Sequence, residues 1–157
     1  FSVVVRALTY VLTLGREGIP EAAKNAVLNA NYMMKRLSEK YTMAYAGPCM
    51  HEFVMCLQDL KDTTGCSAMD IAKGLLDHGI HPPTMYFPLI VHEALMVEPT
   101  ETESQETMDE VCGVFLHLWD VAHDNPQALH DAPTRTPVRR LDEVGAARNP
   151  VLRYTGE

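Results

Sequence analysis

Three histidines lie close together in the middle of the chain, and imidazole suits acid–base chemistry and metal binding near neutral pH. They are His78, His81 and His92. No H-E-x-x-H or similar helical spacing is present, so we expect no metal site. His78 falls in the last turn of an expected helix and is interpreted as its C-terminal cap. His81 stands between Gly79 and a Pro-Pro pair, so a rigid loop can hold its ring for hydrogen bonding to a substrate.

Acidic residues cluster just downstream, at Glu98, Glu101 and Glu103. Neighbouring carboxylates can serve general acid–base catalysis. They also suit the start of a helix, because Thr100-x-x-Glu103 and a second Thr-x-x-Gln box two residues later both fit the capping box. Capping, with compensation of the helix dipole, is the simpler interpretation, and a catalytic role stays open as the alternative.

Other catalytic signatures are missing from the sequence. It contains no G-x-S-x-G, no P-loop and no G-x-G-x-x-G dinucleotide fingerprint. It has no C-x-x-C pair for a zinc knuckle, and we expect four reduced thiols that act as small buried hydrophobes, namely Cys49, Cys56, Cys66 and Cys112. Any chemistry is therefore expected to be completed by residues outside these 157.

Charge is unevenly distributed along the chain. The formal net charge is −8, which argues against nucleic-acid binding. The stretch from Glu98 to Asp124 carries acidic residues and no Lys or Arg, whereas five arginines gather in the C-terminal tail: Arg135, Arg139, Arg140, Arg148 and Arg153. We expect these arginines to pair with carboxylates of this chain or a partner, with anion binding as the alternative.

The first forty residues have a helical pattern. An apolar helix over Val3–Leu14 should end at Gly15, and Pro20 suits the first position of the next helix. That second helix carries one apolar stripe at three- and four-residue steps, which we expect to be core: Ala23, Ala26, Val27, Ala30, Met33, Leu37 and Tyr41.

Short strands and helices alternate after this point. Thr42–Tyr45 and Phe53–Leu57 are predicted to pair as a hairpin. Ser67 and Asp70 have the capping-box spacing and open a helix that Gly79 should end in a left-handed conformation. Helices that alternate with antiparallel strands predict an α+β fold with helices on one face of a sheet.

A proline-rich loop leads into the last part of this pattern. Its prolines predict extended backbone around residues 84–87 that cannot be an interior strand. Leu89–Val91 and Leu95–Val97 are predicted as short buried strands, followed by a helix over Glu103–His123. The apolar face of that helix is expected to be Met108, Val111, Cys112, Phe115, Leu118 or Trp119, and Ala122.

The tail beyond residue 125 is punctuated by proline. Only a short helix is expected there, over Leu141–Arg148, and the tail should lie across another surface. We therefore divide the chain into a helical linking segment over residues 1–41, an α+β small domain over 42–124 and an arginine-rich tail over 125–157. The chain begins at Phe1 inside an amphipathic pattern, so we expect it to be cut from something longer.

Several stretches carry a family resemblance. They are Met50-His51-Glu52-Phe53, Gly79-Ile80-His81-Pro82-Pro83-Thr84, Tyr86-Phe87-Pro88-Leu89, Glu98-Pro99-Thr100-Glu101-Thr102-Glu103-Ser104 and Thr136-Pro137-Val138-Arg139-Arg140-Leu141-Asp142-Glu143, with a weaker match at Asn29-Ala30-Asn31-Tyr32. With these motifs the chain resembles the C-terminal part of the glycine cleavage system P-protein, the oxidoreductase glycine dehydrogenase (decarboxylating). It is most similar to subunit 2 of the two-subunit bacterial form. Ile80 and His92 depart from the family pattern, which has Phe and Pro there.

The resemblance implies a fold and a place in an enzyme. It implies the small C-terminal domain of a fold-type I, aspartate aminotransferase-like enzyme, preceded by a long linking helix. Pyridoxal phosphate would be bound as a Schiff base to a lysine in a large upstream domain. No lysine here matches that position, so no catalytic or cofactor-binding residue is expected within this chain, whose lysines are Lys24, Lys35, Lys40, Lys61 and Lys73. Alone, the segment is expected to be inactive.

Candidate site residues also follow from the resemblance. His81, Thr84, Glu98, Thr100 and Glu101 are expected to face or support the active site. Arg139 and Arg140 are candidates for carboxylate or subunit-interface contacts.

The resemblance also implies binding partners. They are P-protein subunit 1, glycine and the lipoylated H-protein, which accepts the aminomethyl group left by glycine decarboxylation. We expect a bacterial cytoplasmic location, with no nucleic acid and no membrane, because no apolar run reaches about eighteen residues. One alternative is an autonomous, non-catalytic α+β interaction module that docks through its arginine-rich tail. Another is the small domain of a different enzyme that uses pyridoxal phosphate on the same fold.

Overall fold

Four short strands form one antiparallel sheet in a computed structural model that describes residues 1–154 and 156. The strands are β1 (Thr42–Met43), β2 (Phe53–Cys56), β3 (Thr84–Met85) and β4 (Ala94–Val97), in the order β1-β2-β4-β3. Phe53 pairs with Val97 at one end of the central register. The predicted hairpin is confirmed, although its strands are shorter than expected. The proline-loop strand β3 lies at the edge, as its prolines require.

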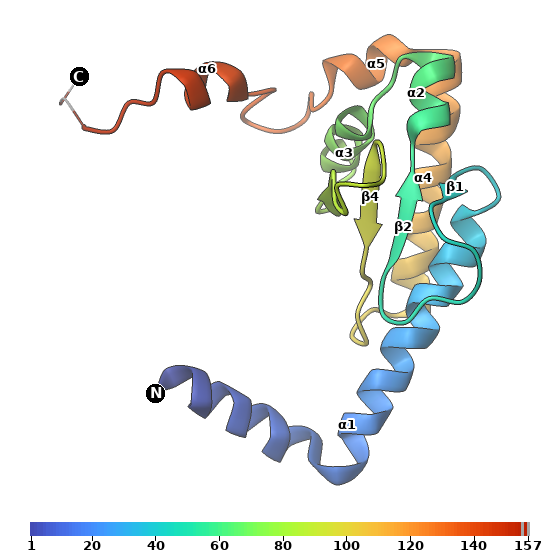
Figure 1. Ribbon diagram of the computed structural model, residues 1–157, viewed down its shortest axis with the longest axis vertical. Helices are drawn as coiled ribbons and strands as arrows, with labels where there is room; N and C mark the ends of the chain where they lie inside the picture. The colour runs from blue at the N-terminus through green and yellow to red at the C-terminus, as the bar shows by residue number, and fades with distance from the viewer. Residues whose placement is uncertain (155, 157) are drawn as a thin grey trace.

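Helices cover one face of this sheet. They include α1 (Ser2–Leu37), α3 (Ala68–Asp77) and α4 (Gln105–Asp124), and α4 runs behind the strands with the second half of α1 beside it (Figure 1). Alternate strand residues share the core with these helices. The core includes Phe53, Met55, Leu95 and Val97 from the sheet and Met33, Leu37, Leu75, Met108, Phe115 and Leu118 from the helices. The predicted α+β arrangement and the apolar face of α4 are thereby confirmed.

The first helix bends at a glycine. Gly15 has φ 65° and ψ −168°, so the break predicted there is confirmed. The helix resumes at once instead of at Pro20, which therefore lies inside the second segment and not at its first position.

The stripe predicted as core is confirmed only in its second half. Ala30, Met33, Leu37 and the following Tyr41 are buried, whereas Ala23 and Val27 are exposed and Ala26 is half-buried. Before Gly15 most of the apolar residues are exposed, and Leu14 is half-buried.

Local caps explain the limits of α3. Ser67 and Asp70 form the predicted capping box, in which the Ser67 hydroxyl accepts the Asp70 N–H at 3.3 Å and the Asp70 carboxylate accepts the Ser67 N–H at 2.7 Å. Gly79 follows with φ 74°, as predicted. His78 is the C-terminal cap residue, and its Nδ1 hydrogen bonds to the Gly74 carbonyl oxygen at 3.0 Å.

Two sequence predictions in the next segment are wrong. Leu89–Val91 lies in a turn instead of a buried strand, with Leu89 and Ile90 84% and 82% exposed and Val91 half-buried. Apolar composition alone predicted the strand, but no neighbouring strand pairs with these residues in the described chain. Helix α4 is capped by Ser104, whose hydroxyl accepts the Thr107 N–H at 3.2 Å, so neither predicted threonine capping box forms. Thr100 has a left-handed φ of 64° that keeps its segment outside the helix.

Three further helices lie in the described part of the chain. The sequence did not predict α2 (Gln58–Thr64) or α5 (Pro126–Asp131), each of which is under two turns long. The predicted short helix of the tail is confirmed as α6 (Glu143–Arg148), which lies away from the body (Figure 1). In residues 1–154 and 156, none of the helices combines the length and hydropathy that crossing a membrane requires.

The cysteines are free thiols. Cys66 and Cys112 are buried, as expected for small hydrophobes, whereas Cys49 and Cys56 are half-buried. Burial raises the pKa of the Cys112 thiol to about 11, which leaves it protonated and unreactive near neutral pH.

Candidate functional site

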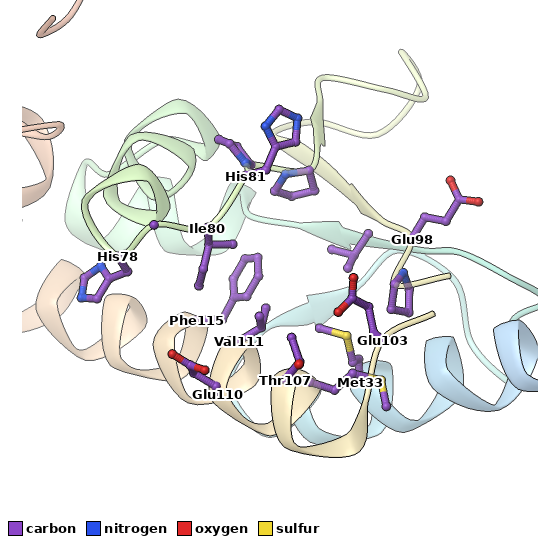
Figure 2. Close-up of a pocket in the computed structure, with 16 residues that line it drawn as sticks. Met33, His78, Ile80, His81, Glu98, Glu103, Thr107, Glu110, Val111 and Phe115 are labelled. Atoms are coloured by element: carbon purple, nitrogen blue, oxygen red, sulfur yellow. The ribbon is translucent and has the colours of Figure 1, made fainter. Parts of the chain in front are cut away.

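A groove with a volume of about 570 Å³ has walls from three segments of the chain, and Met33 of α1 adds to its lining. Residues 78–83 after α3 form one wall, residues 97–99 at the end of β4 form another, and the start of α4 forms the third. In Figure 2, Val111 and Phe115 project from α4 toward Ile80 on the opposite loop. The groove therefore depends on the packing of α3, β4 and α4 against one core.

The groove has an apolar floor and an acidic rim. Apolar side chains that line it include Met33, Ile80, Val97, Met108, Val111 and Phe115. Its charged residues are all acidic, namely Glu98, Glu103 and Glu110, and its polar set is completed by His78, His81 and Thr107. Such a lining favours apolar or cationic groups and disfavours anions.

Local chemistry places His81 at the rim. The left-handed Gly79 turns the chain out of α3, and the Ile80 N–H then donates to the Leu75 carbonyl at 3.0 Å. Ile80 packs against the core, and Pro82 and Pro83 restrict the backbone that follows. His81 is consequently held in an exposed position between a half-buried residue and two prolines.

Asn29 holds the turn that carries Glu98. This α1 residue is only 8% exposed, and its Nδ2 donates to the carbonyl oxygens of Thr100 at 2.9 Å and Glu103 at 3.3 Å. The side chain thus fixes the backbone of the turn just before α4, whose N-terminus is capped by Ser104. Sequence reasoning missed this role, although an asparagine inside a helix, where it is a poor helix former, was a usable signal.

Glu93 holds the loop between β3 and β4 in a similar way. The side chain of Glu93 is 9% exposed, and its backbone has a left-handed φ of 48°. Oε2 accepts the Ala68 N–H at the start of α3 at 2.8 Å, and Oε1 pairs with Lys61. This contact between distant segments was also missed, and a lone glutamate inside the apolar run before β4 was the available signal.

The structure brings only part of the expected site together. His81 and Glu98 both line the groove. Thr84 lies on the edge strand opposite Met96, and neither it nor Thr100 or Glu101 is among the groove-lining residues. The Thr100 hydroxyl instead lies 2.9 Å from that of Thr102.

The two adjacent arginines have different surroundings. Arg140 donates from Nη2 to Asp70 Oδ1 at 2.6 Å and to the Leu129 carbonyl at 2.8 Å. Although burial alone would raise the pKa of Asp70, hydrogen bonds from Ser67 and Arg140 hold it below its usual value. Arg139 is exposed and forms no ion pair within the described part of the chain.

The groove does not fit pyridoxal phosphate by itself. It has no lysine that could form a Schiff base, and its carboxylates would repel a phosphate group. Across residues 1–154 and 156 there is also no cluster of three or more His, Cys, Asp or Glu side chains arranged to hold a metal ion.

A family model and the curated relatives of this chain carry the same name, glycine dehydrogenase. The family described as "Glycine dehydrogenase, C-terminal domain" matches residues 22–134. Relatives named "Probable glycine dehydrogenase (decarboxylating) subunit 2" include those of Treponema denticola, 58% identical over 98% of this chain, and Thermosipho africanus, 53% identical over 100%. The relative from Desulforamulus reducens is 52% identical over 100%.

These alignments cover only part of each relative. The chain spans 32% of the Treponema and Desulforamulus proteins and 33% of the Thermosipho protein, which is about a third of their length. All residues that line the groove fall inside the segment that the family matches. The chain therefore belongs to the glycine dehydrogenase C-terminal domain family.

Proposed function

We propose that this chain is the small C-terminal domain of a fold-type I glycine dehydrogenase (decarboxylating). The enzyme would remove CO₂ from glycine and transfer the remaining aminomethyl group to the lipoyl arm of the H-protein. The observation that carries the proposal is the family match over residues 22–134, which contains every groove-lining residue. Pyridoxal phosphate and its lysine would belong to another part of the enzyme, because the groove described here does not fit them.

The groove would form one side of the substrate cleft. Its apolar floor suits an uncharged aliphatic chain, such as the lipoyl arm, better than the carboxylate of glycine. His81 at the rim can hydrogen bond to the amide that joins the lipoyl group to its carrier lysine. The apolar walls would also exclude water from the reacting groups.

The supporting residues act through the backbone. Asn29 holds Thr100 and Glu103, and through them the turn that presents Glu98. Thr84, Thr100 and Glu101 would support the cleft from outside the groove, through the edge strand and this turn. Subunit 1 and the lipoylated H-protein are the proposed partners, and the subunit designation printed for the relatives supports the first of them.

The proposal is tested in the complete reading frame that contains this sequence, combined with subunit 1, pyridoxal phosphate and lipoylated H-protein. We expect His81→Ala to raise the KM for H-protein about tenfold, the effect of losing about 1.4 kcal/mol of binding, with little change in the KM for glycine. His92→Ala is the matched control, since His92 is exposed and lies outside the groove. Equal KM values for the two variants would overturn the proposed role of the groove.

A further inference from the structure

Three carboxylates border the groove without a basic partner. They belong to Glu98, Glu103 and Glu110, which are all exposed. None of them takes part in an ion pair within residues 1–154 and 156. The residues that line the groove include no lysine or arginine, and the sequence from Glu98 to Asp124 contains none. The rim of the groove therefore has a negative electrostatic potential.

The backbone that carries two of these carboxylates is fixed. Asn29, itself buried, donates to the carbonyl oxygens of Thr100 and Glu103, so the turn between β4 and α4 is tied to α1. Glu110 stands on α4 itself. In Figure 2, Glu98 and Glu103 lie toward one end of the groove and Glu110 toward the other. The negative charge is thus distributed along the rim and held there by the fold.

The floor and the rim of the groove favour different parts of a ligand. The floor is apolar and includes Met108, Val111 and Phe115. A ligand with an aliphatic chain and a polar head would place the chain on this floor and the head at the rim, near His81. The charge of that head then determines how favourable binding is.

The lipoyl group occurs with two heads of almost the same size. In lipoamide, as in the lipoyl arm joined to its carrier lysine, the head is a neutral amide. In free lipoic acid the head is a carboxylate. The aliphatic chain and the dithiolane ring are identical in both, so the floor cannot distinguish them. At the rim, an amide N–H can donate to a glutamate carboxylate, whereas a second carboxylate is repelled.

We propose that Glu98, Glu103 and Glu110 make the groove selective for the amide-linked lipoyl arm against free lipoic acid. This inference rests on the proposed function, in which the lipoyl arm occupies the groove. The three glutamates are specificity residues, because they act on the charge of the ligand head and not on the reacting atoms. Free lipoic acid would accordingly be a poor competitor of the lipoylated H-protein.

The test measures inhibition of glycine-dependent bicarbonate exchange in the complete reading frame, combined with subunit 1, pyridoxal phosphate and lipoylated H-protein. Lipoamide and lipoic acid are the two competitors. At about 0.01 M salt, where the Debye length is about 30 Å, we expect an inhibition constant about tenfold lower for lipoamide. At about 1 M salt, where that length is about 3 Å, the ratio should fall to about two.

The groove variant combines Glu98→Gln, Glu103→Gln and Glu110→Gln, which keep the side-chain size and remove the charge. We expect its two inhibition constants to agree within about twofold at low salt, because lipoic acid now binds more tightly. Structural damage to the groove would instead weaken both competitors together. The lipoamide constant therefore serves as the internal reference.

A matched control removes three acidic groups that are exposed and lie outside the groove, with Glu106→Gln, Asp124→Asn and Asp131→Asn. It should keep the tenfold preference. An equal loss in the control would show an effect of net charge alone and would overturn the inference. So would a preference that persists in the groove variant or is absent from the parent, and in these cases competition by lipoamide leaves the proposed function standing. If lipoamide does not compete with H-protein, the proposed function of the groove fails and this inference fails with it.

Discussion

Asp70 is a buried carboxylate on which several segments converge. Its side chain is 7% exposed, it caps α3 with Ser67, and it binds Arg140 from the tail. His130 Nδ1 lies 3.4 Å from the same oxygen. A buried carboxylate with this many donors is stable only while they remain in place.

Removing the guanidinium of Arg140 should therefore destabilise the domain. We expect Arg140→Ala to lower the free energy of unfolding by about 2 to 3 kcal/mol, because Asp70 loses a charged donor and two carbonyl groups lose their partner. Arg139→Ala is the control and should change it by less than about 0.5 kcal/mol. Urea denaturation measures the free energy of unfolding of both variants. Equal losses would contradict the assignment of Arg140, and not Arg139, as the residue that binds Asp70.

Acid should weaken the same contact. The pKa of Asp70 is lowered from 3.8, so its ionisation stabilises the fold above about pH 4, and this contribution is lost as pH falls through the lower folded value. We expect the stability difference between the parent and Asp70→Asn to shrink below pH 4, by at most about 1.4 kcal/mol per pH unit. Denaturation curves between pH 7 and 2.5 test this, and a difference that stays constant in acid would contradict it.

Residue-level prediction from sequence succeeded where the cause is local. His81 lies on the loop expected for it, since a left-handed glycine precedes it by two residues and two prolines follow it. Its contact with a substrate stays a prediction. Asn29 and Glu93 were missed because their partners are distant in the chain. Asn29 holds a carbonyl 71 residues away and Glu93 an N–H 25 residues away, and no local pattern predicts such pairs.

At the scale of elements, replacing two helical glycines by alanine should change the stability of the fold in opposite directions. A Cβ on Gly113 in α4 meets nothing within 4 Å, so Gly113→Ala should stabilise the fold by about 1 kcal/mol through helix propensity. A Cβ on Gly74 in α3 would lie 3.0 Å from Leu129 and 3.1 Å from Leu118, both in the core, so Gly74→Ala should destabilise it by about 1 kcal/mol. Thermal unfolding of both variants is the measurement, and stabilisation by Gly74→Ala would refute this packing.

Prediction of the elements was reliable where a pattern extends over several turns. The periodic stripes of α1 and α4 and the capping box of α3 identified those helices. The turn at residues 89–91 was mistaken for a strand because three apolar residues carry no periodicity. The start of α4 was misplaced because the possible caps overlap at residues 100–105, and the structure uses Ser104, with Thr100 held outside the helix by its left-handed φ.

At the scale of the whole molecule, the core lies between α1 and α5, and both ends of the chain extend from it (Figure 1). The family match over residues 22–134 corresponds closely to this body. The α+β class was predictable from alternating helices and strands, whereas the groove was not, because it is made by distant segments that only the packing brings together. The sequence likewise could not show that Arg140 binds its own domain and Arg139 does not.

The most direct test of the account is glycine-dependent exchange of labelled bicarbonate, which reports reversible decarboxylation. The complete reading frame is combined with subunit 1, lipoylated H-protein and pyridoxal phosphate, and compared with the same protein lacking residues 1–157. We predict exchange with the intact protein and none after the deletion. Exchange that survives the deletion would contradict the need for this domain. Bound, absorbing pyridoxal phosphate without exchange in the intact protein would contradict its assignment to glycine decarboxylation.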